Sequence, residues 1–224
     1  MTVHQLKQKA PSAYKMKAKG NTSAEIFIYG DIGESFWGDG VSAKKFAEDL
    51  RALGDKITHI DLHINSDGGV VTDARAMYNL LVQHKARVVS HVDGIAASAA
   101  SFLAMAGDEI IIAEGGFFMI HNARTIAAGE AKDFRQIADV LETVNGTIID
   151  TYVARTGKDA AQVKKWMDAE TWFTGKEAVE HGFADRMVEN MRVAASISDR
   201  HSFKNLPAAL RPGRAAAAAL IART

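Results

Sequence analysis

The sequence predicts an α/β fold in which strands and helices alternate along the chain and most strands run parallel. Stretches of alternating apolar residues, of which Ile60, Leu62 and Ile64 are the clearest, are followed by stretches with apolar residues at helical spacing. All three prolines lie near the ends of the chain, which leaves a proline-free body from residue 12 to 206. The composition, 47% hydrophobic and 24% charged, is that of an ordinary soluble globular protein.

The first half of the body begins with a short strand expected over residues 25–29. Ser42 can cap a helix with a regular apolar face, and Gly54 ends that helix. The alternation of residues 59–64 predicts a half-buried strand. The pair Gly68-Gly69 then turns the chain into a further helix, whose apolar residues lie at helical spacing.

The second half continues the alternation with six further elements. In order, we expect a strand over 87–92, a small-residue helix over 97–106, strands over 109–113 and 117–120, a long helix over 129–155 and a last helix over 174–182. This alternation of strand and helix favours a layered arrangement around a mostly parallel sheet.

The chain is expected to consist of one domain with two flanking segments. Residues 1–20 are lysine-rich and have no clear periodicity, so we expect an N-terminal arm. Residues 21–192 form the expected domain. Residues 193–224, which end in an alanine-rich stretch, are expected to be a partly flexible C-terminal tail.

Charge and cysteine content exclude several classes of function. The chain has 27 basic and 27 acidic residues, which argues against binding to nucleic acid or anionic lipid. No apolar run is long enough to span a membrane, and the N-terminus lacks the apolar core of a secretory signal. The absence of cysteine excludes a thiol nucleophile and fits a reducing compartment, so we expect a cytoplasmic protein. No phosphate-binding loop with its lysine is present, so the chain shows no ATPase of its own.

Three short segments carry residues suited to acyl transfer. A serine among small residues, Ser98, is expected at the start of a helix, where the helix terminus favours negative charge. His121 ends an apolar run and can reach into a cleft as a general base. The Gly68-Gly69 turn can present backbone N–H groups to a tetrahedral intermediate.

Each of these residues also has a structural interpretation. The small residues around Ser98 could serve close helix packing alone, and Ser101 is a competing hydroxyl one turn deeper in the same helix. A lone histidine is more often structural than catalytic, and a glycine pair can be only a turn. The occurrence of all three together is what predicts a serine hydrolase, most readily a peptidase.

A catalytic histidine usually needs a carboxylate that orients it. Asp168 and Glu170 are the two candidates, and they would share one face if their segment is extended. Both could instead be solvated loop charges.

No metal site and no cofactor are expected. His59 and His63 share one face of a predicted strand, but four residues at ~3.3 Å each put them about 13 Å apart, too far for one ion.

The ordered motifs resemble those of the Clp protease proteolytic subunit family. They are Ile-Asn-Ser-x-Gly-Gly at 64–69, Gly-x-Ala-Ala-Ser at 94–98, Met-Ile-His at 119–121, Thr-Gly at 156–157 and Glu-Ala-x-Glu-x-Gly at 177–182. Details such as Met-Ile-His-Asn-Ala at 119–123 and Glu-Thr-Trp-Phe-Thr at 170–174 are most similar to the branch from bacteriophages and prophages, the head maturation (prohead) proteases.

This resemblance implies a ClpP/crotonase-type fold of repeated β-β-α units with a protruding handle helix that begins near residue 129. It implies Ser98 as nucleophile and His121 as base, with the N–H groups of Gly69 and Ala99 as the oxyanion hole. It also implies a homo-oligomeric ring, with the handle pairing subunits into stacked rings, and substrates bound as an extended strand.

The sequence departs from the family pattern at two positions. The third triad member is usually an aspartate, and the spacing puts Glu170 there, with Asp168 as the alternative acid. The proline common before the paired glycines is Asp67 here.

Four functions are compatible with these residues. The first is an ATP-independent serine endopeptidase that processes capsid or scaffold proteins during phage head maturation. The second is a degradative Clp-type peptidase that works with a separate AAA+ unfoldase. The third is a crotonase-like acyl-CoA enzyme, whose chemistry does not require Ser98 and His121 as a pair. The fourth is an assembly protein without activity.

Overall fold

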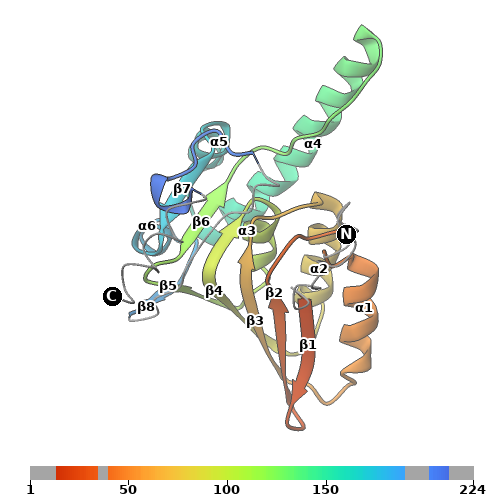
Figure 1. Cartoon of the computed structure of the whole chain (residues 1–224), viewed down its shortest axis with the longest axis vertical. Helices are drawn as coiled ribbons and strands as arrows, with labels where there is room; N and C mark the ends of the chain where they lie inside the picture. Colours follow the sequence, from red (N-terminus) through yellow and green to blue (C-terminus); the bar gives the residue numbers. More distant parts are fainter. Residues whose placement is uncertain (1–13, 35–39, 190–201, 212–224) are drawn as a thin grey trace, which may run out of the picture.

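The computed structural model describes residues 14–34, 40–189 and 202–211. One eight-stranded sheet forms its centre, with helices packed around it (Figure 1). The strands are β1 (Tyr14–Lys19), β2 (Ser23–Ile28), β3 (His59–Ser66), β4 (Arg87–Ala97), β5 (Glu109–Ala113), β6 (Phe117–Ile120), β7 (Thr171–Thr174) and β8 (Arg186–Val188). The helices are α1 (Ala43–Ala52), α2 (Val71–Val82), α3 (Ala99–Ala104), α4 (Ala131–Thr156), α5 (Ala160–Asp168), α6 (Gly175–Glu180) and the 3-10 turn η1 (Ala208–Leu210).

The sheet is mostly parallel, and its topology brings together strands distant in the sequence. Its main path runs β1-β2-β3-β4-β5-β8, and only the β1–β2 pair on this path is antiparallel. Strand β4 has eleven residues and pairs with β5 in its first half and with β6 in its second. Strand β7 pairs antiparallel with β6. The end of β4 therefore lies against β6, which in turn lies against β7.

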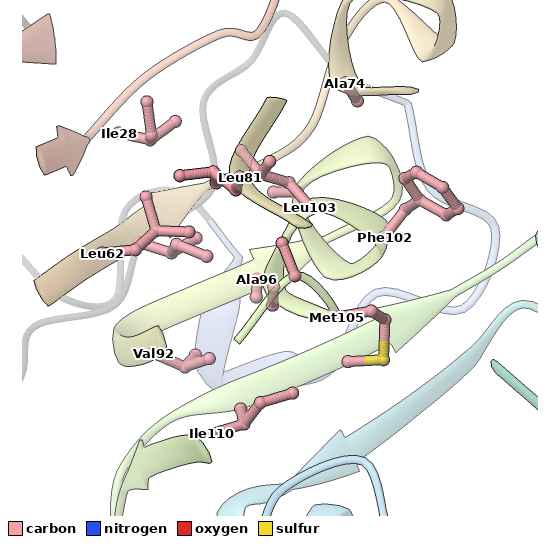
Figure 2. Packing of buried hydrophobic residues seen from close by; sticks show 14 of the residues in the cluster. Ile28, Leu62, Ala74, Leu81, Val92, Ala96, Phe102, Leu103, Met105 and Ile110 are labelled. Carbon is pink, nitrogen blue, oxygen red and sulfur yellow. The ribbon is translucent and has the colours of Figure 1, made fainter. Parts of the chain in front are cut away.

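Buried apolar side chains fill the space between the sheet and the helices α2 and α3. Strand β3 shows the predicted alternation, since Ile60, Leu62 and Ile64 are fully buried. Figure 2 shows Leu62 and Ala96 from the sheet beside Leu81 of α2 and Leu103 of α3. Burial of these side chains is the main force that holds the helices against the sheet.

A second, smaller apolar cluster lies on the opposite face of β4 and β6. It contains Ile95, Ala97, Met119 and Leu210. Neighbouring strand residues point to opposite faces, so Ala96 joins the main core while Ile95 and Ala97 join this cluster. Residues 202–211 thus cover a face of the sheet that the helices leave open.

The predicted α/β class and the mostly parallel sheet are confirmed. Helix α3 is shorter than the predicted 97–106, because β4 continues through Ala97. Residues 14–19, expected within the N-terminal arm, form β1, in which lysines alternate with Tyr14, Met16 and Ala18. Strand β1 is thus an edge strand with a basic face, a common protection against edge pairing.

The segment around the two candidate acids is not the extended chain that would put Asp168 and Glu170 on one face. Helix α5 begins after Asp159, whose side chain accepts a hydrogen bond from the Gln162 N–H, and it runs to Asp168. Only from Thr171 onward is the chain a strand.

The boundaries predicted at residues 20 and 192 stay predictions. Residues 1–13 of the predicted arm, and residues 193–201 and 212–224 of the predicted tail, lie outside the described residues. Across the three ranges that the structure describes, no helix combines the length and the apolar composition needed to cross a bilayer.

Candidate active site

Ser98 stands at the junction of β4 and α3 in a backbone conformation that is rare for a residue with a side chain. Its φ is 54° and its ψ is −123°. Although it holds the N-cap position of α3, its side chain makes no capping hydrogen bond. The strained turn instead leaves the hydroxyl free to face another group.

That group is His121, which directly follows β6. The parallel pairing of β4 with β6 brings the two strand ends together, and the Ser98 N–H donates to the Met119 carbonyl at 3.0 Å. The Nε2 atom of His121 lies 2.7 Å from the Oγ atom of Ser98. This is the hydrogen-bond geometry that allows an imidazole to take a proton from a serine hydroxyl.

Glu170 reaches the other side of the His121 ring. It sits between α5 and β7 with a φ of 49°, and the pairing of Ile120 with Thr171 sets it beside His121. Its Oε2 atom is 3.9 Å from His121 Nδ1, and the two side chains are 6% and 9% exposed. The separation is that of an ion pair and exceeds a hydrogen bond.

Asp168, the alternative acid, lies in a different environment. Its carboxylate accepts hydrogen bonds from Lys164 Nζ at 2.7 Å and from Asn122 Nδ2 at 2.8 Å. These partners, Lys164 first, hold the pKa of this carboxyl below its ordinary value. Its side chain is 48% exposed, so it differs from Glu170 in both burial and partners.

The glycine pair lies against the Ser98 turn. Gly68 has a φ of 108°, and a Cβ atom there would stand 2.8 Å from the Cβ atom of Ser98 and 3.0 Å from the Ala99 nitrogen. A Cβ atom on Gly69 would meet the carbonyl oxygen of Ile32 at 2.0 Å. Only glycine fits at either position. The backbone of Gly68 therefore runs close to Ser98, and that of Gly69 close to Ile32.

Two backbone N–H groups in this region are available to a ligand. Within the described part of the chain, neither the Gly69 nor the Ala99 N–H donates to a protein acceptor. Unpartnered N–H groups next to a serine hydroxyl are what the stabilisation of a developing oxyanion requires.

A small apolar pocket adjoins the serine, and an open groove begins at Gly69 of the glycine pair. The pocket lies between Ser98 and α4 and is lined by Phe102, Ile148 and Tyr152 among others. The groove runs between the segment that follows Gly69 and the segment that follows His121.

Ser101, the competing hydroxyl, is fully buried and already makes hydrogen bonds within the protein. Its Oγ atom donates to the Ser98 carbonyl at 2.6 Å and lies 2.8 Å from the hydroxyl of Tyr152. Burial raises the pKa of Tyr152. This contact joins α3 to α4 and gives Ser101 a structural role.

The histidines of β3 and β4 pair with carboxylates. His59 and His91 both contact Asp61, at 3.2 and 3.0 Å, and His63 contacts Asp93 at 2.8 Å. In residues 14–34, 40–189 and 202–211, no group of three or more His, Asp or Glu side chains is arranged to hold a metal ion.

Sequence reasoning missed the residues that contact the site from the C-terminal segment. The N–H of Asn205 donates to Glu170 Oε1 at 2.7 Å, and the Phe203 ring lies 6.1 Å from the His121 ring. The signal was the spacing of Phe203, Leu206 and Leu210, apolar residues in a stretch assigned to a tail.

Comparisons with known proteins show the family to which the chain is similar. The Clp protease family model matches residues 8–191, which is most of the chain. The ATP-dependent Clp protease proteolytic subunit 2 of Thermobifida fusca (strain YX) is 33% identical over 145 residues, which cover 63% of this chain and 70% of that protein. The proteolytic subunit 1 of Protochlamydia amoebophila (strain UWE25) is 33% identical over 132 residues, which cover 57% of this chain and 64% of that protein.

A family match of this extent includes β1 to β8 and α1 to α6. The chain therefore belongs to the Clp protease family of serine peptidases.

Proposed function

We propose that this protein is a serine endopeptidase in which Ser98 is the nucleophile, His121 the general base and Glu170 the orienting acid. The observation that carries the proposal is the 2.7 Å contact between Ser98 Oγ and His121 Nε2, at the end of two paired strands. The strained turn at Ser98, which frees its hydroxyl from helix capping, supports the same role.

The proposed reaction is acyl transfer. Ser98 Oγ attacks the peptide carbonyl while His121 Nε2 takes the hydroxyl proton. The N–H groups of Gly69 and Ala99 bind the oxyanion of the tetrahedral intermediate. When this intermediate collapses, the C–N bond breaks and the imidazolium gives its proton to the leaving amine. Water, activated by His121, then attacks the acyl-enzyme and releases the second product.

Glu170 stabilises the imidazolium that forms at His121. The distance of 3.9 Å between them describes the resting protein, and such contacts often tighten only when substrate is bound. A glutamate has one more methylene than an aspartate and can close this gap by side-chain rotation. We therefore assign the acid role to Glu170, with Asp168 as the alternative.

The groove that begins at Gly69 suits an extended peptide. Residues 69–72 and residues 123–125 line it, together with Ile32, Leu141 and Val144 among others. The Ala123 N–H is bound by the Asn145 side chain at 2.8 Å, which anchors the second of these segments to α4. A substrate strand between the two segments would present its carbonyl to Ser98.

Two biological roles share this chemistry. The motif details favour processing of capsid or scaffold proteins during phage head maturation. The names of the relatives, which describe proteolytic subunits of ATP-dependent proteases, favour degradation of proteins delivered by a separate AAA+ unfoldase. In both roles the subunits are proposed to form a homo-oligomeric ring, as Clp family proteins do, with α4 at the contact between stacked rings.

Cleavage assays test the chemistry and separate the roles. We expect the wild type to cleave an unfolded protein such as casein, and Ser98→Ala to abolish cleavage while the matched variant Ser101→Ala retains it. A wild type that is folded but inactive on casein and peptides would contradict the proposal. Cleavage of co-expressed capsid or scaffold protein at defined sites supports the maturation role, whereas dependence on an added unfoldase for folded substrates supports the degradative role.

A further inference from the structure

The C-terminal segment 202–211 packs against the side of the sheet that carries the candidate triad. Its Leu210 is 1% exposed within the smaller apolar cluster, together with Ile95, Ala97 and Met119. Figure 1 shows this segment, in the darkest blue, beside β7. Apolar burial thus fixes the segment onto β4 and β6, the two strands that lead into Ser98 and His121.

Polar contacts aim the same segment at the turn that holds Glu170. The Asn205 N–H donates to Glu170 Oε1 at 2.7 Å, and Asn205 Nδ2 donates to the Ala169 carbonyl at 2.6 Å. At the start of the segment, Nη1 of Arg124, three residues after His121, donates to the Ser202 carbonyl at 2.7 Å. Hydrogen bonds at Ser202 and at Asn205 therefore hold the segment beside Glu170.

The two oxygens of Glu170 have different partners. Oε1 accepts the backbone N–H of Asn205, and Oε2 faces His121 Nδ1. A carboxylate that is 6% exposed needs a donor to offset the loss of water. Because the donor is a backbone group, its position is set by the fold of the segment and not by a side-chain rotamer.

Glu170 needs such a restraint more than an aspartate would. Its longer side chain has one more rotatable bond, and its own backbone has a φ of 49° in a turn between two elements. With Oε1 bound by the Asn205 N–H, the other oxygen, Oε2, faces His121 Nδ1. The Phe203 ring packs edge-on against Trp172, with 5.2 Å between ring centroids, and also lies next to the His121 ring.

We infer that Asn205 is a positioning residue for the triad, because its backbone N–H holds the Glu170 carboxylate in the orientation that serves His121. The inference rests on the proposed function. It assigns to the C-terminal segment a part in the catalytic arrangement.

The test compares two substitutions of Asn205 in the full chain. Asn205→Pro removes the backbone N–H, and Asn205→Ala keeps it while removing the side-chain contact to Ala169. With a fluorogenic peptide, we expect Asn205→Pro to lower kcat about tenfold or more with KM nearly unchanged, because hydrogen bonds to charged groups are strong. We expect Asn205→Ala to stay within about threefold of the wild type. Equal losses in the two variants, or a change confined to KM, would overturn the inference.

A double-mutant cycle tests whether the fall in kcat caused by Asn205→Pro depends on Glu170. Adding Asn205→Pro to Glu170→Ala should cost no further activity, because the carboxylate it positions is already absent. The same loss in both backgrounds would show an effect independent of Glu170 and would refute the positioning role.

Hydrogen exchange provides a measurement that does not depend on the proline variant folding. In the Glu170→Ala protein the Asn205 amide has lost its acceptor, so it should exchange at least about tenfold faster than in the wild type. Unchanged exchange would contradict the inference. A wild type without hydrolysis would overturn the proposed function together with the inference, whereas an active wild type with equal kcat in the two Asn205 variants overturns the inference alone.

Discussion

Two side chains of the candidate site extend from backbone conformations that only glycine adopts easily. Ser98 has a φ of 54° and Glu170 a φ of 49°, and they are the two non-glycine residues with positive φ in the described chain. Each such residue costs roughly 1–3 kcal/mol, which the surrounding structure must offset. Both flank His121, one on each ring nitrogen. Strain at these two positions is thus concentrated where geometry matters for the proposed reaction.

The roles of the two candidate acids can be separated by substitution. We expect Glu170→Ala to lower kcat by roughly 10²- to 10⁴-fold, because the imidazolium loses its buried carboxylate. Asp168→Ala should change kcat less than about threefold, since its carboxylate is exposed and bound to Lys164 and Asn122. Steady-state hydrolysis of a peptide substrate measures both. A larger loss in Asp168→Ala than in Glu170→Ala would transfer the acid role to Asp168.

The glycine pair predicts a second effect at the residue scale. Gly68→Ala places a Cβ atom 2.8 Å from Ala97 O and from Ser98 Cβ, at a φ of 108°. We expect the turn to shift and kcat/KM to fall by about 10²-fold or more. Gly146→Ala is the control, because it lies on an exposed helical position with nothing within 4 Å of the new atom, and should stabilise α4 by about 1 kcal/mol. Equal activity in the two variants would contradict this account of the turn.

At the scale of elements, local sequence patterns predict β3 and α2 but do not predict β1 and α5. The alternation in β3 and the helical spacing in α2 are properties of those segments alone, so they predict both elements. Strand β1 is exposed and lysine-rich, and it gains its stability by pairing with β2. Helix α5 is short, and its cap at Asp159 was the available signal.

The pairing of β1 with β2 predicts a dependence of stability on pH. Hydrogen bonds from Lys17 and Lys19 lower the pKa of Glu25 from 4.5 to about 2. A carboxyl with a lowered pKa in the folded state stabilises the fold above its unfolded pKa, and this contribution is lost as the pH falls toward 2. We expect Glu25→Gln to lower the free energy of unfolding at pH 6, with the difference from wild type shrinking below about pH 4.5. Denaturant titrations at several pH values measure this, and a difference that grows on acidification would be the wrong sign.

At the scale of the whole molecule, the site depends on contacts between distant parts of the chain. The sequence predicts Ser98 and His121 as a pair because each lies in its own short motif at the end of an element. The contact of Asn205 with Glu170 spans 35 residues and accompanies the packing of Leu210 against Ile95, Ala97 and Met119 of β4 and β6. No local pattern encodes such a contact, so the sequence alone predicts a tail for this segment.

The projecting helix α4 predicts association of subunits. Figure 1 shows α4 extending beyond the rest of the molecule, and along this region Phe134 and Val140 are 50% and 58% exposed and Ile126 is fully exposed. Large apolar side chains gathered on a projection are typical of an interface. We expect Val140→Asp to reduce the mass measured by analytical ultracentrifugation, while Glu142→Gln on the same helix leaves it unchanged. A wild type that is monomeric at micromolar concentration would contradict the proposed ring.

The most direct test of the central claim, an activated Ser98 served by His121, is intact-mass spectrometry after treatment with a fluorophosphonate probe. We expect a single adduct on the wild type, no adduct on Ser98→Ala, and slower labelling of Glu170→Ala than of Asp168→Ala. Absence of an adduct on a folded, assembled wild type, or an adduct that persists in Ser98→Ala, would contradict the assignment of Ser98 as the nucleophile.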